Sequence, residues 1–392
     1  MLAIVFFSTT VVLGAALAGS WVFFSRLSFN AIPQELPELP ARTAAAPTPV
    51  SPLLLGYKLD LPGRGEIFPA LASEAQAKKE YWPLGVLTIS NRSDRPVLQS
   101  ITAQVPGWTE MSEQTVVIGP REVRAVPLSP DLLERAFSND AVRRATLRVR
   151  VANPMGDVTF SQNRPVLLHG SSDLYWGKKF ANAQYVARWV TPHEPAVQQL
   201  VTEAQKMVPN GRLPGYNARA NTSAKTMEVQ VQRQVEAVFN ALRKSGISYV
   251  SSIYTFGDYV GQAQRIRLPA ETLKLRSANC VDVSVAFASA MENIGLQPVV
   301  VIVPGHAFAG VRLGPQGAKT LYLDLTVLPK GTLRQAIARA EAWRRKSATG
   351  ETLTVDIAAA RALKIYPLPY EGSSEVLAAS RSAEEVGAER RK

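Results

Sequence analysis

The sequence predicts an α+β protein in which an N-terminal transmembrane helix and an all-β sandwich precede a domain of mixed helices and strands. Three observations predict this order. An uncharged apolar run opens the chain, short apolar-alternating runs fill residues 84–168, and a helical apolar stripe followed by a hairpin pattern begins at residue 280. The 392 residues, 46% hydrophobic and 19% charged, are enough for two globular domains.

Residues 2–24 contain no charged side chain, and as a helix they would be about 34 Å long, enough to cross a bilayer core. We therefore expect a single-pass membrane anchor there, with Trp21 at the interface. The alternative is a cleaved signal peptide, because Ala16-Leu17-Ala18 has the small-x-small form of a cleavage site.

Residues 25–80 are rich in proline, which favours extended conformations, and they are interpreted as a stalk or linker. Arg26 and Arg42 follow the apolar run and favour a cytoplasmic body by the positive-inside tendency. The stalk favours the opposite, a periplasmic or other extracytoplasmic body, and we prefer that reading. At the other end, residues 371–392 mix small and charged residues and are predicted to be a disordered tail.

Residues 81–169 are predicted to form the sandwich. In the run Ala145 to Val151, Leu147, Val149 and Val151 alternate with arginines, as a strand with one buried face requires. The pattern is similar to that of immunoglobulin-like modules of bacterial surface proteins, a resemblance of pattern without a motif. A protein or polymer is a possible partner of this sandwich. No aromatic residues interleave with the arginines of this region, so no nucleic-acid partner is predicted.

The cysteine and histidine counts limit the chemistry. One cysteine excludes an intramolecular disulfide, and three histidines with one thiol leave no cluster for a Cys/His zinc site. We predict no cofactor-binding residues and no metal ligands. The net charge of +12 favours acidic partners in general.

The informative segment begins at Cys280. From Val283 onward, apolar residues recur with helical spacing as far as Ile294, and Gly295 and Pro298 end the pattern, so Cys280 is placed at a helix N-terminus. There the positive end of the helix dipole favours a thiolate. Asp282 either caps this helix or orients the loop before it.

A buried strand and a hairpin pattern follow the helix. If the hairpin turn centres near Pro315, His306 and Asp324 face each other on one side of the sheet, with Leu321, Leu323 and Leu325 on the other. A register slip of two residues would keep this face, and a slip of one would remove Asp324 from it. Cys280, His306 and Asp324 then supply a nucleophile, its base and the carboxylate that orients the base.

At these residues the sequence resembles the transglutaminase-like superfamily of papain-type thiol enzymes. The matching segments are Asn279-Cys280-Val281-Asp282, Gly305-His306-Ala307-Phe308 and Asp324-Leu325-Thr326. Leu325 departs from the family's frequent proline, and Ala307-Phe308 from its common His-Ala-Trp. The resemblance covers residues 171–370.

The resemblance implies a thiol enzyme that forms a thioester at Cys280 from an amide of a protein or peptide substrate. Hydrolysis by a peptidase or amidase is favoured over transglutamination. The backbone N–H of Cys280 and the side chain of Gln264 are candidate oxyanion donors. The alternative is a catalytically silent scaffold whose β-sandwich binds a protein or polymer.

Overall fold

A computed structural model describes residues 54–61, 65–77, 83–216, 223–250, 263–315, 319–347 and 352–368. The predicted anchor over residues 2–24 and the predicted tail over residues 371–392 lie outside these ranges, as does most of the predicted stalk.

The predicted fold class and localisation need a correction. The described part of the chain is α+β, and it holds no helix with the length and hydropathy needed to cross a membrane. The transmembrane helix of the predicted fold class and the single-pass membrane localisation are therefore not supported by the described residues, and residues 2–24, on which both predictions rest, lie outside them. Apolar composition alone suggested the anchor, and no helix of the described chain supplies one.

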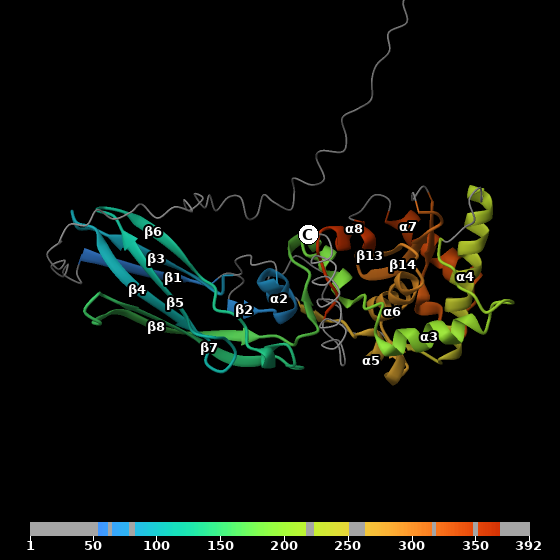
Figure 1. The fold of residues 1–392 in the computed structure, drawn as a ribbon, viewed down its shortest axis with the longest axis horizontal. Coiled ribbons are helices and arrows are strands. Elements are labelled where there is room, and N and C mark those ends of the chain that lie inside the picture. Colours follow the sequence, from blue (N-terminus) through green and yellow to red (C-terminus); the bar gives the residue numbers. More distant parts are fainter. Residues whose placement is uncertain are drawn as a thin grey trace, which may run out of the picture. The chain divides into compact units, whose positions relative to one another are not determined.

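Two sheets pack around one core in the N-terminal part (Figure 1). One has three strands in the order β1-β3-β6 and the other five in the order β2-β8-β7-β4-β5. Every strand pair is antiparallel except β2 with β8. The strands are β1 (Leu55–Asp60), β2 (Glu66–Ile67), β3 (Gly85–Asn91), β4 (Val97–Gln104), β5 (Ser112–Ile118), β6 (Val123–Leu128), β7 (Arg143–Ala152) and β8 (Val158–Leu168).

Part of the segment predicted as a stalk is folded. Strand β1 pairs with β3 along its whole length, and helix α2 (Pro69–Ala77) buries Ala70 and Leu71 in the same apolar cluster as Trp189. Proline-rich composition favours extended chain, but extended chain also suits an edge strand once a neighbouring strand accepts its hydrogen bonds. The boundary of the first sheet thus lies earlier than residue 81.

The C-terminal part contains a four-stranded sheet in the order β15-β14-β13-β16. Its strands are β13 (Pro298–Val303), β14 (His306–Arg312), β15 (Thr320–Leu323) and β16 (Leu353–Asp356). The helices are α3 (Pro195–Gln205), α4 (Ala224–Lys244), α5 (Pro269–Leu275), α6 (Cys280–Asn293), α7 (Leu333–Lys346) and α8 (Ile357–Ala362). Two short pairs complete it, β9 (Asp173–Tyr175) with β11 (Ala263–Arg265) and β10 (Ser248–Tyr249) with β12 (Ser277–Ala278). Short 3-10 turns in this part span Lys178–Phe180, Ala183–Trp189 and Leu325–Val327, and one in the sandwich spans Glu134–Ala136.

Helix α6 is buried on all sides rather than amphipathic. Val283 and Phe287 belong to the cluster formed with α3 and α4, whereas Val281 and Val285 belong to the cluster that contains Trp189. The predicted apolar stripe marked only one of these two faces. A helix that is apolar all round belongs in the interior of a domain, and α6 accordingly holds Cys280 inside the protein.

Candidate active site

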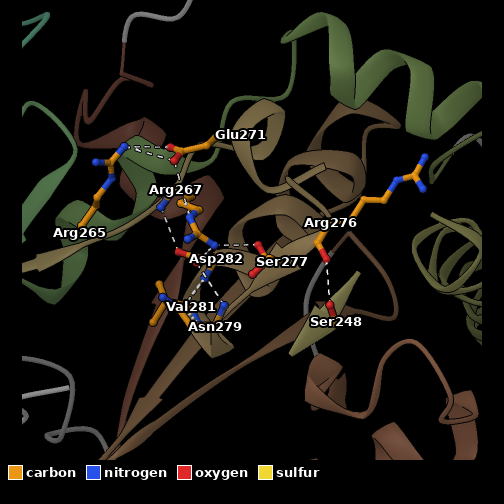
Figure 2. Close-up of polar contacts among 9 residues, drawn as sticks. All are labelled: Ser248, Arg265, Arg267, Glu271, Arg276, Ser277, Asn279, Val281 and Asp282. Atoms are coloured by element: carbon orange, nitrogen blue, oxygen red, sulfur yellow. Dashed lines mark hydrogen bonds and ion pairs between the residues drawn. The ribbon is translucent and has the colours of Figure 1, made fainter. Parts of the chain in front are cut away.

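Cys280 is the first residue of α6, and a capping box holds that end of the helix (Figure 2). The Asn279 side-chain oxygen accepts hydrogen bonds from the N–H groups of Val281 and Asp282 at 2.8 and 2.9 Å, and the Asn279 N–H donates to Asp282 Oδ2 at 3.1 Å. These bonds satisfy N–H groups that a helix start leaves without intrahelical partners. The backbone that carries the thiol is therefore rigid.

Asp282 both caps the helix and holds the preceding segment. Its Oδ1 accepts the backbone N–H of Arg267 at 2.9 Å, and the Arg267 guanidinium donates to the carbonyl of Ser277 at 2.9 Å (Figure 2). Burial raises the pKa of Asp282, while the backbone N–H groups of Arg267 and Asn279 oppose that rise. The two roles that the sequence left open are thus combined in one carboxylate.

His306 is the first residue of β14 and lies opposite Val303 at the end of β13. The two strands are joined by Pro304 and Gly305 alone, and Gly305 has φ +76°, a conformation that glycine adopts without strain. The imidazole of His306 is buried, and the hydrogen-bonding and charge of the nearby Cys280 side chain contribute to raising the pKa of that imidazole. The tight turn therefore fixes the position of the His306 imidazole near the thiol.

The register of β14 with β15 differs by two residues from the prediction. Ala309 faces Leu323 and Val311 faces Leu321, whereas a turn centred at Pro315 would have placed Ala309 opposite Leu321. A shift of two residues keeps every side chain on its face of the sheet. Asp324 therefore stays on the side of His306, although it follows β15 instead of lying within it.

Asp324 is fully buried and meets four groups. Its Oδ2 accepts from His306 Nε2 at 2.9 Å and lies 3.0 Å from Arg339 Nε, while its Oδ1 accepts from the N–H and hydroxyl of Thr326 at 3.1 and 2.6 Å. The backbone N–H of Asp324 donates to the carbonyl of Ala336 in α7. Buried carboxylates require such partners, so the carboxylate is held in one orientation.

The linked side chains shift each other's protonation. Burial would lower the pKa of His306, but the hydrogen bonds and charges of Asp324 and Cys280 outweigh it and raise the pKa from 6.5 to about 9. Burial would raise the pKa of Asp324, but the hydrogen bond and charge of His306, with the bonds from Thr326, lower it. The favoured state at neutral pH is an imidazolium beside a carboxylate. Since Nε2 is bound to Asp324, Nδ1 is the nitrogen left for the thiol.

Helix α7 supplies contacts that sequence reasoning missed. The indole of Trp343 stacks on the His306 imidazole with centroids 4.5 Å apart and 23° between planes, and Arg339 pairs with Asp324. The helix begins with a capping box at Thr332 and Gln335, a pattern visible in the sequence. That signal could have located the helix, but not its position against β14.

Gln264, the candidate oxyanion donor, lies on β11. Its Oε1 accepts from the indole N–H of Trp176 at 2.9 Å, and Trp176 belongs to the same apolar cluster as Cys280. The Gln264 Nε2 atom is buried and meets no hydrogen-bond acceptor in the described part of the chain. Gln264 thus keeps an unused amide donor in this cluster.

The arrangement suits nucleophilic chemistry and offers no metal centre among the described residues. A thiol, an imidazole and a carboxylate are linked in sequence, with the groups 1%, 5% and 0% exposed for Cys280, His306 and Asp324. Low exposure strengthens charge interactions because little water screens them. It also means that a substrate must displace protein groups to reach the sulfur.

Comparisons with known proteins do not place the chain in a family. No family model and no curated protein matches it. Among solved structures, a FixG-related protein from Vibrio parahaemolyticus is 13% identical over 31% of this chain and 98% of that chain, with a TM-score of 0.19. An exo-chitosanase from Amycolatopsis orientalis, solved with PNP-beta-D-glucosamine, is 11% identical over 61% of this chain and 31% of that chain, also with a TM-score of 0.19. Likenesses this weak bear on neither fold nor function.

Proposed function

We propose that this chain is a thiol enzyme of the transglutaminase-like type that transfers the acyl group of a protein or peptide amide through a thioester at Cys280. The observation that carries the proposal is the continuous link from Cys280 through His306 to the buried Asp324. Cysteine and histidine are the usual partners in such acyl transfer, with the carboxylate holding the imidazole.

Each step has a group to perform it. The Cys280 thiolate attacks the amide carbon, and a C–S bond forms as the carbonyl oxygen takes up negative charge. The C–N bond then breaks and the imidazolium of His306 gives its proton to the leaving amine. Water or a second amine attacks the thioester, His306 takes the proton, and the C–S bond breaks to restore the thiolate.

The negative oxygen of the intermediate requires hydrogen-bond donors. We assign that role to the backbone N–H of Cys280 and the Nε2 group of Gln264, which is buried without an acceptor among the described residues. An amide held ready by Trp176 needs no reorganisation when the charge develops.

One observation favours the alternative of a silent scaffold. The thiol is 1% exposed, and a cysteine inside an apolar cluster is an ordinary core residue. In that case the sandwich would carry the function by binding a protein or a polymer. A scaffold requires no interaction between Cys280 and His306, whereas an enzyme does, and because Cys280 helps to raise the pKa of His306 we prefer the enzyme.

The test is intact-mass analysis of the full-length chain after incubation with an electrophilic peptide-amide probe. Because Cys280 is the sole cysteine of the sequence, one adduct per chain assigns the site. We expect a stoichiometric adduct that is absent in Cys280→Ala and slowed about 10²–10⁴-fold in His306→Ala.

The matched control is His169→Ala. His169 is buried to a similar degree and is also paired with a carboxylate, Glu66, at 3.1 Å, yet it lies at the end of β8 outside the proposed site. It should label at the parental rate. Folded parent protein that forms no adduct, or equal slowing in both histidine variants, would sink the enzyme proposal in favour of the scaffold.

A further inference from the structure

One face of helix α7 carries side chains that contact His306 and Asp324. Arg339, Trp343 and Lys346 are spaced four and three residues apart, so they lie on one face of the helix. Arg339 is paired with Asp324, Trp343 is stacked on His306, and the Lys346 ammonium lies 5.0 Å from the Trp343 ring centroid. This face therefore combines two cations and an aromatic ring beside the imidazole.

The Arg339 guanidinium connects the buried site to solvent. Its Nε is 3.0 Å from the fully buried Oδ2 of Asp324, yet the Arg339 side chain is 54% exposed. A guanidinium carries five N–H donors. The contact with Asp324 is through Nε, and in the part of the chain that the structure describes no other carboxylate pairs with this guanidinium or with its two terminal nitrogens. These nitrogens form a planar fork, the geometry that binds carboxylates at two points.

The remaining charges of α7 do not cancel this cationic surface. The helix has five basic residues and one acidic residue, Glu341. Glu341 is bound by Arg344, whose guanidinium also lies 4.2 Å from the centroid of Tyr322. Arg344 and Glu341 therefore pair with each other, which leaves Arg339 at Asp324 and Lys346 at Trp343 without an acidic partner on α7 itself.

The distances place Arg339 close to the imidazole, on the side where Asp324 lies. Arg339 Nε and His306 Nε2 each contact the same Asp324 oxygen, at 3.0 and 2.9 Å, so they lie within about 6 Å of each other. An extended peptide advances about 3.5 Å per residue. A substrate with its amide at Cys280 would thus bring the adjoining residues to Arg339.

We propose that Arg339, assisted by Lys346, is an anion-binding subsite that selects peptide substrates bearing a carboxylate one or two residues from the reacting amide. The reaction part of this inference rests on the proposed function, whereas the charge selection does not. The carboxylate can belong to an acidic side chain or to the end of a peptide. The Arg339 guanidinium would then pair with two carboxylates: the buried Asp324 of the protein and the carboxylate of the substrate on the solvent side.

The first experiment measures charge selection with two small reagents. Iodoacetate and iodoacetamide alkylate the same thiol and differ in one charge, so the ratio of their rates at Cys280, relative to glutathione, reports the local positive potential. We expect Arg339→Gln to lower this ratio about 3- to 10-fold, as loss of a unit charge at this separation predicts. Arg339→Lys should restore much of it.

Arg334→Gln is the control variant. It removes the same charge from an exposed residue in the first turn of α7, five residues before Arg339. Its ratio should stay within about two-fold of the parent, because an exposed charge at longer range is screened. A ratio that falls equally in Arg334→Gln and Arg339→Gln would overturn the subsite.

The second experiment does not need an active thiol. Binding of two peptides that differ only in Glu or Gln beside the amide is measured on Cys280→Ala protein by ligand-observed NMR, and a third and fourth peptide exchange a terminal carboxylate for a carboxamide. We expect the acidic member of at least one pair to bind at least three-fold tighter, and this preference to vanish in Arg339→Gln. The pair that shows the preference identifies the source of the carboxylate.

The two proposals fail in different ways. A charge preference in binding without any adduct at Cys280 removes the enzyme and retains the subsite. An adduct at Cys280 with equal affinity for charged and neutral peptides removes the subsite and retains the enzyme.

Discussion

The strands of the sandwich and the strands of the C-terminal sheet are buried in different ways. In β3 and β4, buried residues alternate with more exposed ones along the strand, whereas every residue of β13 is buried and β14 is buried up to Arg312. The sandwich strands have one solvated face. The β13–β14 hairpin is covered on both faces, by α6 on one and by Ala340 and Trp343 of α7 on the other.

This difference decides what a histidine can do. His169 directly follows the sandwich strand β8 and pairs with Glu66, whereas His306 begins the covered strand β14 and pairs with Asp324. Only His306 has its pKa raised by a nearby thiol, that of Cys280, and is covered by a stacked indole. A similar pair of residue types therefore makes a structural contact in one region and a candidate catalytic centre in the other. The comparison can be tested through stability.

The largest expected effect is the loss of a large side chain from the covered hairpin. Phe308 is fully buried among valines of β13, so Phe308→Ala leaves a cavity and should lower the free energy of unfolding by about 3–5 kcal/mol. Val117 lies on the solvated face of β5 at 51% exposure, so Val117→Ala should change the free energy of unfolding by less than about 0.5 kcal/mol. Urea unfolding followed by circular dichroism measures both. Similar costs for the two variants would contradict the two-sided burial.

The next effect is the dependence of stability on pH. Because the pKa of His306 rises from 6.5 to about 9 on folding, the folded state binds its proton more tightly than the unfolded state. Its stabilisation is complete below about pH 6.5 and is lost as the pH rises through about 9, by roughly 3 kcal/mol at about 1.4 kcal/mol per unit.

Urea unfolding between pH 6 and pH 10 measures this loss, with His306→Gln as the comparison. The parent should have a higher free energy of unfolding than the variant at low pH, and this difference should shrink as the pH passes about 9. The same window governs the proposed chemistry, since protonation of the leaving amine should fail as His306 loses its proton. A difference that is flat across this range would show that the imidazole is not held by Asp324 and Cys280.

The smallest effect compares two helix caps. Asn279 is buried and accepts two backbone N–H groups at the start of α6, so Asn279→Ala should destabilise the protein by about 1–2 kcal/mol. Ser223 accepts one N–H at the start of α4 and is exposed, so water replaces it in Ser223→Ala at a cost of about 0.5 kcal/mol. Thermal unfolding distinguishes them. Equal shifts in melting temperature would mean that the cap at Asn279 contributes no more to stability than the exposed cap at Ser223.

Local patterns predicted much of the C-terminal part. Asn279 before Cys280, Gly295 after the helix and the β-branched run from Val299 to Val303 depend on neighbouring residues alone, and the structure has a helix and a strand there. The face that Asp324 shares with His306 also followed from the period of a strand, even though the register was wrong by two residues.

Other features depend on residues far apart in the sequence. The run from Leu55 to Asp60 reads as linker until β3 pairs with it, and the apolar stripe of α6 did not reveal that its opposite face is buried as well. The apolar run at residues 2–24 suggested a membrane helix; this run lies outside the described residues, which hold no helix long and apolar enough to cross a membrane. Composition reports the hydrophobicity of a segment and not the surface that covers it.

The sequence by itself determined which residue types carry the candidate chemistry and which element begins or ends at each, because caps, turns and strand periods act over a few residues. Only the tertiary structure decided that α7 lies against β14, so that Trp343 stacks on His306 and Arg339 reaches Asp324. The physical reason is that packing between elements is set by shape and burial over the whole core, which no local pattern records.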